Sequence, residues 1–205
     1  GWVLGETLIT GIGQGYTQTT PLQLCMMTAQ IANGGYSIKP KIIVDNNPLS
    51  FEDAKQAMEK GLLYDKETKS FKDKKLFKDK KNIKIVQEAM FSSTNERFGT
   101  SYRSRIDDPR YQFAGKTGTA QVKRISKRER ELDLKLEQIP YKDRDHALYV
   151  AYGPYINPRY ALSIIVEHGG SGSKTAAPIA KKLFKLIIDR HELRKKQSNF
   201  EEISI

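Results

Sequence analysis

Four consecutive residues, Lys116, Thr117, Gly118 and Thr119, have side chains and a spacing that could bind a peptide. They lie in the run YQFAGKTGTAQVK, which is typical of a strand with small residues at its centre. In a strand, Lys116 and Gly118 face one side of the sheet and both threonines face the other. Because Gly118 has no Cβ, a ligand can approach the backbone closely there. An extended peptide could pair with an open strand edge, its terminal carboxylate bound by the lysine and hydroxyls while a backbone N–H donates to a developing oxyanion.

Three further polar features are predicted to be structural. His146 and Asp145 have no serine beside them, so we expect a pair at a strand start that hydrogen-bonds to backbone. The run GIGQG at 11–15 resembles a phosphate loop, but Tyr16 replaces the third glycine of a dinucleotide fingerprint, which favours a tight turn. Cys25 is the only cysteine and is predicted to be a small buried hydrophobe. Without a His/Cys cluster, the sequence predicts no metal site and no cofactor.

A helix buried on most sides is predicted in the run PLQLCMMTAQIANGG. Thr20 fits its N-cap and Gln23 the reciprocal partner of a capping box, with Pro21 at the first helical position. Gly34 and Gly35 fit the C-terminal stop. Nearly all residues between these signals are apolar, which is typical of a central helix in a domain larger than the helix itself.

Four other segments have recognisable patterns. NIKIVQEAMFSS predicts an amphipathic helix with an apolar face at Ile83, Val86 and Met90. HALYVAYGPYINPRYALSIIVEHGG predicts two antiparallel strands joined by a turn at YINPRY. The run SKTAAPIAKKLFKLIIDRHELRKK predicts a long helix with an apolar face at Ile179, Leu183, Leu186 and Ile187. Asp107 and Asp108 are predicted to form a turn before Pro109.

Composition and charge set wider bounds. The chain has 205 residues, of which 38% are hydrophobic and 29% charged, as is ordinary for a globular protein. No run of about 18 apolar residues is present, and the N-terminus has no signal peptide. Two readings are consistent with this, a cytoplasmic protein or an address and anchor upstream of Gly1, and we expect the second. The net charge of +11 favours binding to polyanions, but it does not distinguish nucleic acid from anionic lipid headgroups or an acidic polymer. Charged insertions are predicted near 46–81 and 124–145, the first as a solvent-facing or mobile stretch and the second as a basic helix or loop.

Several separated blocks resemble the class B penicillin-binding proteins. Lys-Thr-Gly alone also fits a β-turn, but IGQGYTQTTPLQLCMMTAQIANGG, AGKTGTAQV and DHALYVAYGPYINPRYALSIIVEHGGSGS occur here in the family's order, before a final amphipathic helix. The run RDHAL is similar to the elongation-specific branch, penicillin-binding protein 2. The resemblance covers about residues 5–190 and is weakest at 46–81.

This resemblance implies a fold and a domain boundary. The expected class is α/β of the α+β type, with a central antiparallel sheet flanked by helices, as in the penicillin-binding and serine β-lactamase-like transpeptidase fold. Residues 1–192 would form the C-terminal part of the transpeptidase domain, and 193–205 a polar tail. The fold would be incomplete at its N-terminal side, because the first two strands of the sheet would come from before the serine and pair beside 160–167. Without them this apolar edge is exposed, so we expect the chain to self-associate through it, cover it with its tail, or aggregate.

The resemblance also implies an activity, a peptidoglycan D,D-transpeptidase. In the family, a serine of an S-x-x-K motif attacks D-Ala-D-Ala and passes the acyl group to an amine of a neighbouring stem peptide, and β-lactams acylate the same serine. Here Lys116, Thr117 and Thr119, with Gly118 between them, would bind the terminal carboxylate, and the Thr119 N–H would form half of the oxyanion hole. The expected partners are a lipid-linked glycan polymerase and elongation-complex proteins at the periplasmic face of the bacterial inner membrane.

The catalytic serine is expected upstream of Gly1, so no nucleophile is predicted in this chain. Ser171 to Lys174 matches S-x-x-K by letter, but it follows Lys-Thr-Gly and lies in a glycine loop, so it is predicted to be a loop and helix cap. Ser93 to Asn95 matches S-x-N and is predicted to be a helix C-terminus.

Two alternative functions remain open at this point. One is a catalytically dead relative, truncated or separately encoded, that serves as a binding or scaffold module of the same family. The other is a nucleic-acid binder, which only the charge supports, so no specific nucleic-acid site is predicted.

Overall fold

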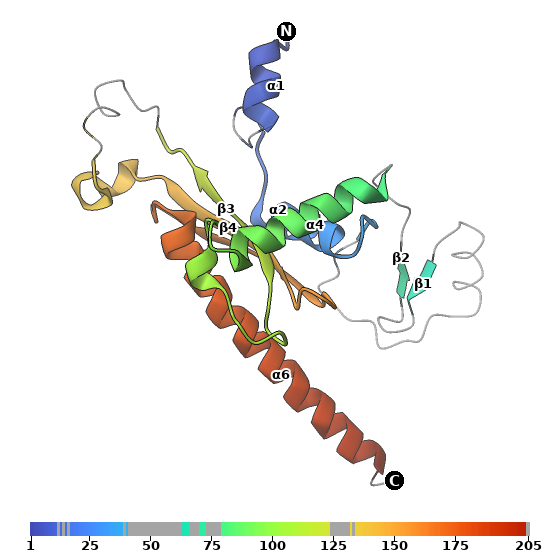
Figure 1. The fold of residues 1–205 in the computed structure, drawn as a ribbon. Helices are drawn as coiled ribbons and strands as arrows, with labels where there is room; N and C mark the ends of the chain where they lie inside the picture. Colours follow the sequence, from blue (N-terminus) through green and yellow to red (C-terminus); the bar gives the residue numbers. More distant parts are fainter. Residues whose placement is uncertain are drawn as a thin grey trace.

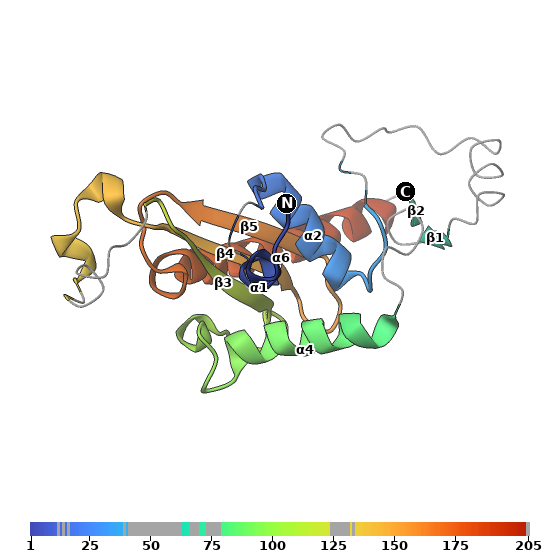
Figure 2. The same cartoon turned by 90° about the horizontal axis from the view of Figure 1, so that it is seen from above.

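The computed structural model describes residues 1–11, 13, 15, 17–38, 40, 63–65, 70–72, 79–123, 132 and 134–203. Its centre is a three-stranded antiparallel sheet with the strand order β3-β4-β5. Helix α2 packs against one face of this sheet and helix α6 against the other, while α4 runs along the β3 side (Figures 1 and 2). This arrangement confirms the predicted class, a central antiparallel sheet flanked by helices.

The three strands are β3 (Ala114–Ala120), β4 (His146–Gly153) and β5 (Tyr160–Val166). Each was predicted from the sequence, and β4 and β5 form the predicted antiparallel hairpin. On one face, β4 presents alanines and Tyr149 to α6, and Tyr149 is fully buried. On the other face, Tyr152 and partly buried residues of β4 and β5 pack towards α2 and α4.

Helix α2 (Pro21–Ala32) begins and ends as predicted. The Thr20 hydroxyl accepts from the Gln23 N–H at 3.2 Å, and the Gln23 side-chain oxygen accepts from the Thr20 N–H at 2.8 Å, which completes the capping box. Gly34 and Gly35 follow with φ of 86° and 93°, the left-handed conformation that stops a helix.

The expected burial of α2 on most sides is wrong for the described residues. Only Thr28 is buried, while 58% of Leu22 and 42% of Met27 are exposed. The reason is that α2 has one sheet face to pack on, formed by β4 and β5, and meets α4 only near its end, where Gln87 donates to the Ile31 carbonyl at 2.7 Å.

Helix α4 spans Lys80–Asn95 and starts at Asp79, whose carboxylate accepts from the Lys81 N–H. Ile83 and Met90 are buried as predicted, but Val86 is 41% exposed. Val86 belongs to the wall of an open groove rather than to the contact with the sheet.

Helix α6 (Ala177–Ile203) follows a π-helical turn at Gly172–Ala176. Its predicted apolar face is wrong in part, because 39% of Ile179 and 64% of Leu186 are exposed. The residues that face the sheet are Ala177, Ala180, Phe184 and Ile188. The small alanines let the helix approach the sheet closely, and the Phe184 ring stacks on Phe113 at 4.8 Å.

Helix α6 also continues through most of the segment 193–205, which was predicted to be a polar tail and is helical up to Ile203. Near the other terminus, helix α1 (Leu4–Gly11) was not predicted; it projects away from the sheet and contains no buried residue (Figure 1).

The charged stretch 46–81 lies largely outside the described residues, whereas 124–145 is described at 132 and 134–145. Within 46–81 the structure shows a short antiparallel pair, β1 (Leu63–Asp65) and β2 (Ser70–Lys72). Within 124–145 it shows two 3₁₀ turns, Leu136–Gln138 and Tyr141–Asp143. None of the helices in the described ranges is long and apolar enough to cross a membrane.

Candidate functional site

The Lys-Thr-Gly-Thr run occupies the second half of β3, as predicted. Thr117 pairs with Tyr149 and Gly118 with Leu148 in the antiparallel register with β4. Because Tyr149 faces α6, both threonines lie on the α6 face and Lys116 and Gly118 lie on the face of α2. The predicted alternation of the four side chains is therefore confirmed.

The first half of β3 is covered, and the second half is open. The Asn95 side chain, at the end of α4, donates to the Phe113 carbonyl at 2.9 Å, just before the strand. Ala114 is buried, but Lys116 and Thr119 are exposed. In the part of the chain that the structure describes, no strand pairs with the other edge of β3. The edge is thus accessible from Lys116 onward.

Lys116 also borders an apolar groove of about 680 Å³ between α2 and α4. Its Nζ donates to the Thr117 carbonyl at 2.8 Å, so the ammonium group lies against its own strand. The groove wall includes Met27, Ile31, Val86, Met90, Phe98 and Lys116. A cation therefore lies beside an otherwise apolar hollow, at the point where the strand edge opens.

Two glycines allow close packing around this strand. A Cβ added to Gly118 would lie 3.3 Å from Leu148 Cβ, so the strand has little space for a side chain there. A Cβ added to Gly172 would lie 2.6 Å from the Gly118 carbonyl oxygen and would also collide with the Leu148 oxygen. The start of the π-helical turn therefore packs directly on the strand backbone. One sequence signal for this contact is the glycine-rich run GGSGS, because glycines permit such close packing.

A buried cluster of three hydroxyl groups lies beside β3, next to Gly115. The Tyr149 hydroxyl is 2.9 Å from Thr94 Oγ1 and 3.2 Å from Ser101 Oγ. Burial raises the pKa of Tyr149, although its bonds to Ser101 and Thr94 partly oppose the shift. Gly115 leaves room for this cluster, since an added Cβ would collide with the Tyr149 ring and hydroxyl. Sequence reasoning missed the cluster, because its members come from three separate segments.

The comparisons with known proteins bear directly on this strand and its surroundings. The family model for the penicillin binding protein transpeptidase domain matches residues 1–185. This chain belongs to the penicillin-binding protein transpeptidase-domain family. The match includes the Lys-Thr-Gly strand and both helices that flank the groove.

Relatives of this transpeptidase domain agree in sequence and in fold. The chain is 32% identical to the peptidoglycan D,D-transpeptidase MrdA of Haemophilus influenzae over 182 residues, which are 89% of this chain and 26% of that protein. The structure of the complex between penicillin-binding protein 2 and MreC from Helicobacter pylori has 30% identity and a TM-score of 0.67, covering 92% of this chain and 28% of that one.

Pseudomonas aeruginosa penicillin-binding protein 2 in complex with WCK 5153 is also similar, with 34% identity, a TM-score of 0.64, and coverage of 90% and 34%. These matches confirm the predicted resemblance to the penicillin-binding protein 2 branch and its fold. The chain spans about a quarter of the length of the curated relatives it matches.

Two serine motifs of this transpeptidase domain were predicted to be structural. Ser93 to Asn95 are the last residues of α4, which confirms the predicted helix C-terminus. Ser171 lies in the loop before the π-helical turn, as predicted, but its side chain makes no cap bond and instead lies 3.0 Å from Ser173 Oγ. The expected side-chain cap is wrong because the neighbouring serine engages the hydroxyl.

The acidic and imidazole groups at the start of β4 bond to backbone, as predicted. The Nδ1 atom of His146 accepts from the His168 N–H at 2.9 Å. The Asp145 carboxylate accepts from the Val122 N–H at 3.3 Å. Over the described ranges, no group of three or more His, Cys, Asp or Glu side chains could hold a metal ion.

The remaining predictions concern Cys25 and the glycine run at 11–15. Cys25 is half-buried, its thiol lies 3.4 Å from the Ala161 carbonyl, and burial raises its pKa. Gly13 and Gly15 have φ of 80° and 92°, and the described residues of this run follow α1 as a turn. The tight turn is confirmed for those residues.

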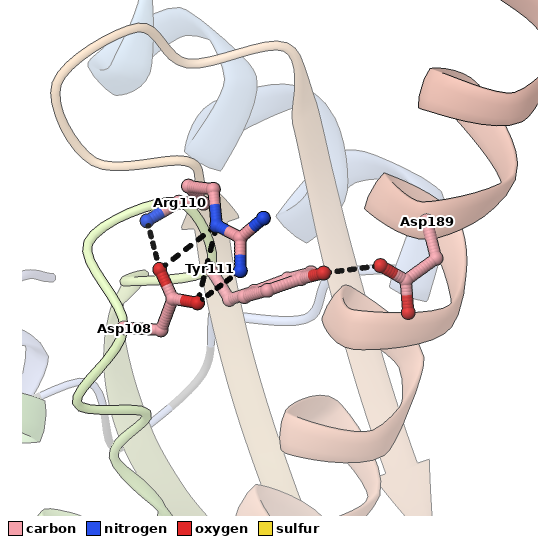
Figure 3. Close-up of polar contacts among 4 residues, drawn as sticks. All are labelled: Asp108, Arg110, Tyr111 and Asp189. Carbon is pink, nitrogen blue, oxygen red and sulfur yellow. Dashed lines mark hydrogen bonds and ion pairs between the residues drawn. The ribbon is translucent and has the colours of Figure 1, made fainter.

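The predicted turn at Asp108 is also confirmed; it precedes β3 in the chain and contacts α6 through Tyr111 (Figure 3). The Asp108 carboxylate accepts from the Arg110 N–H at 3.0 Å and binds its guanidinium at 2.6 Å, and these bonds lower the pKa of Asp108. Next to it, the Tyr111 hydroxyl donates to Asp189 on α6, and this bond raises the pKa of Tyr111. The segment that leads into the Lys-Thr-Gly strand is thereby fastened to the final helix.

Proposed function

We propose that this chain forms one wall of the active site of a peptidoglycan D,D-transpeptidase, which crosslinks stem peptides by serine acyl transfer and is acylated by β-lactams. The observation that carries the proposal is the β3 edge, open from Lys116 onward, in a domain of the penicillin-binding protein transpeptidase family. An open edge with a lysine and hydroxyls suits an extended peptide that ends in a carboxylate.

Each residue of the run has a role in this proposal. The stem peptide adds to the open edge as a strand, and its terminal carboxylate meets Lys116, Thr117 and Thr119, of which Lys116 and Thr119 are exposed. Lys116 then exchanges its bond to the Thr117 carbonyl for one to the carboxylate, which is stronger because both partners are charged. The Thr119 N–H supplies half of the oxyanion hole. Gly118 keeps the approach to the strand free of a side chain.

The nucleophile is proposed to lie outside Gly1–Ile205. Ser171 and Ser93 are the alternatives within the chain, but neither is placed as an activated nucleophile requires. The hydroxyl of Ser171 bonds to another serine, and Ser93 lies 3.4 Å from Thr100 Oγ1. A catalytic serine needs a general base within hydrogen-bond reach.

The partners and location follow from the family in the same proposal. The neighbouring Helicobacter pylori structure contains penicillin-binding protein 2 together with MreC, which supports an elongation-complex partner for this protein. We further propose a lipid-linked glycan polymerase as a second partner. The protein would act at the periplasmic face of the bacterial inner membrane, where peptidoglycan is crosslinked.

Intact-mass spectrometry after incubation with a penicillin tests the proposal. The chain Gly1–Ile205 is expected to gain no adduct, whereas the protein encoded by the complete gene gains one penicillin on a serine outside this range. A Lys116→Ala variant of the complete protein should be acylated more slowly. A matched Lys182→Ala variant, on the exposed side of α6, should react at the wild-type rate.

Two results would contradict the proposal in different ways. A stoichiometric adduct on Ser171 or Ser93 would place the nucleophile inside the chain. Absence of any adduct on the complete protein would favour the alternative function, a catalytically dead binding or scaffold module.

A further inference from the structure

The two threonines of the Lys-Thr-Gly-Thr run differ in what they contact. The Thr117 hydroxyl lies 3.1 Å from Thr100 Oγ1, which in turn lies 3.4 Å from Ser93 Oγ. Thr119 is exposed, and no other described side chain bonds to its hydroxyl. One hydroxyl of the run is therefore occupied by the protein itself, and the other is free for a ligand.

Thr100 lies between Gly99 and Ser101, and both of these neighbours pack against the end of α4. The N–H and the hydroxyl of its neighbour Ser101 both donate to the Ser93 carbonyl, each at 3.0 Å. A Cβ added to Gly99 would lie 2.6 Å from the Ser93 carbonyl carbon, so this segment packs tightly on the end of α4. The Ser101 hydroxyl also forms a buried hydrogen bond with the Tyr149 hydroxyl, at 3.2 Å. Fixed supports of this kind are what a precise binding site requires.

We propose that Thr100 is a positioning residue for the Lys-Thr-Gly strand. Its hydroxyl holds that of Thr117 and so sets the position of the strand edge, including the Lys116 side chain and the Thr119 N–H. This inference rests on the proposed function for its effect on acyl transfer. The contact itself is a property of the chain and can be tested separately.

The physical reason for an effect on rate is distance. The oxyanion hole acts only when its N–H lies at hydrogen-bond distance from the developing charge. A strand that leaves the edge of its sheet unpaired can shift there, because no neighbouring ladder restrains it. The bond between Thr100 and Thr117 supplies a restraint on that side.

A double-mutant cycle in the complete protein measures this coupling. Thr100→Val and Thr117→Val should each lower the second-order rate constant for acylation by a fluorescent penicillin about tenfold, since small misplacements of reacting groups are costly. The double variant should be no slower than the slower single variant, because both changes remove the same contact. Thr100→Ser should restore the rate. Thr28→Val is the matched control, because the one bond of the Thr28 hydroxyl among the described residues stays within its own helix, to the Leu24 carbonyl.

Amide hydrogen exchange in the chain Gly1–Ile205 provides a measurement that does not need activity. Because the proposal gives the Thr119 N–H to the open edge, the N–H groups of Lys116 and Gly118 alternate with it and point towards β4. Thr100→Val should speed exchange at Lys116 and Gly118 and leave exchange in β5 unchanged, which also shows that the variant is folded. Unchanged exchange at both residues would overturn the inference. So would single variants whose rate losses multiply in the double variant. An unreactive wild-type protein with the expected exchange pattern would instead contradict the proposed function alone.

Discussion

Gly172 is a residue without a side chain whose position matters for the whole Lys-Thr-Gly strand. It begins the π-helical turn before α6 and lies directly on the backbone of Gly118 and Leu148. Any Cβ at this position would have to displace main-chain atoms of two strands, and main-chain atoms within a sheet have little freedom to move.

We expect Gly172→Ala to destabilise the fold by about 2 kcal/mol, the usual cost of overpacking a core. Urea unfolding followed by circular dichroism measures this cost. Gly5→Ala is the control, since a Cβ at Gly5 on the exposed helix α1 meets nothing within 4 Å. A Gly172→Ala variant as stable as the wild type would show that the turn can move away from the strand.

At the scale of the element, local signals predict where α2 begins better than they predict what covers it. The Thr20 capping box depends on residues three positions apart, so the sequence contains all the information it needs. Burial depends on partners from elsewhere in the chain. For this reason the start of α2 was predicted correctly, whereas its burial and the apolar face of α6 at Leu186 were not.

We expect Thr20→Ala to cost about 1 kcal/mol of stability, because the Gln23 N–H in the first turn of the helix loses its acceptor, the Thr20 hydroxyl. Gln23→Ala should cost less, since it removes the bond to the exposed Thr20 N–H before the helix and places a residue of high helix propensity at position 23. Thermal unfolding of both variants and of Thr19→Ala, a neighbouring exposed threonine, would measure the difference. Equal losses for Thr19→Ala and Thr20→Ala would mean that the cap contributes nothing specific.

Strand β5 has one edge paired with β4 and, over the described ranges, no strand on its other edge. The sequence-based expectation that the chain associates through this edge therefore stays a prediction with a clear test. We expect the chain to form dimers or larger species in analytical ultracentrifugation, because an unpaired apolar strand can pair with a second copy.

Ile165→Lys should shift this population towards the monomer, since Ile165 is exposed on β5 and a charge there opposes edge-to-edge pairing. Ile179→Lys is the matched change on the exposed side of α6 and should leave the association unchanged. If Ile179→Lys instead gives the monomer, the association surface is α6.

For the whole molecule, the sequence predicted the sheet, the hairpin and the place of Lys116, because alternation and turn residues are local patterns. It did not predict the contacts that β3 makes on its α6 face. Gly172 and Tyr149 are near the strand only because the chain folds back twice, through β4 and through the turn before α6. Such contacts depend on packing between distant segments, which a single sequence does not specify residue by residue.

The buried tyrosines of the sheet should also make the stability of the whole fold depend on alkaline pH. Burial raises the pKa values of Tyr149 and Tyr152 above the ordinary value of about 10, which the unfolded chain retains. Below that value both states hold these protons, and the contribution to stability is fully present. As the pH rises above it, the unfolded chain loses protons that the folded chain keeps, so the free energy of unfolding falls.

Tyr152→Phe should weaken this pH dependence. Its hydroxyl is buried without a hydrogen-bond partner among the described residues, so the variant should be at least as stable as the wild type near neutral pH. Urea unfolding at pH 8 and pH 10.5, with tyrosinate absorbance at 295 nm, measures both effects. Tyr102→Phe, on the 3₁₀ turn after α4, is the control for loss of a tyrosine as such. An identical fall in stability for wild type and Tyr152→Phe would show that Tyr152 ionises in the folded state, and that the core on the α2 face admits water.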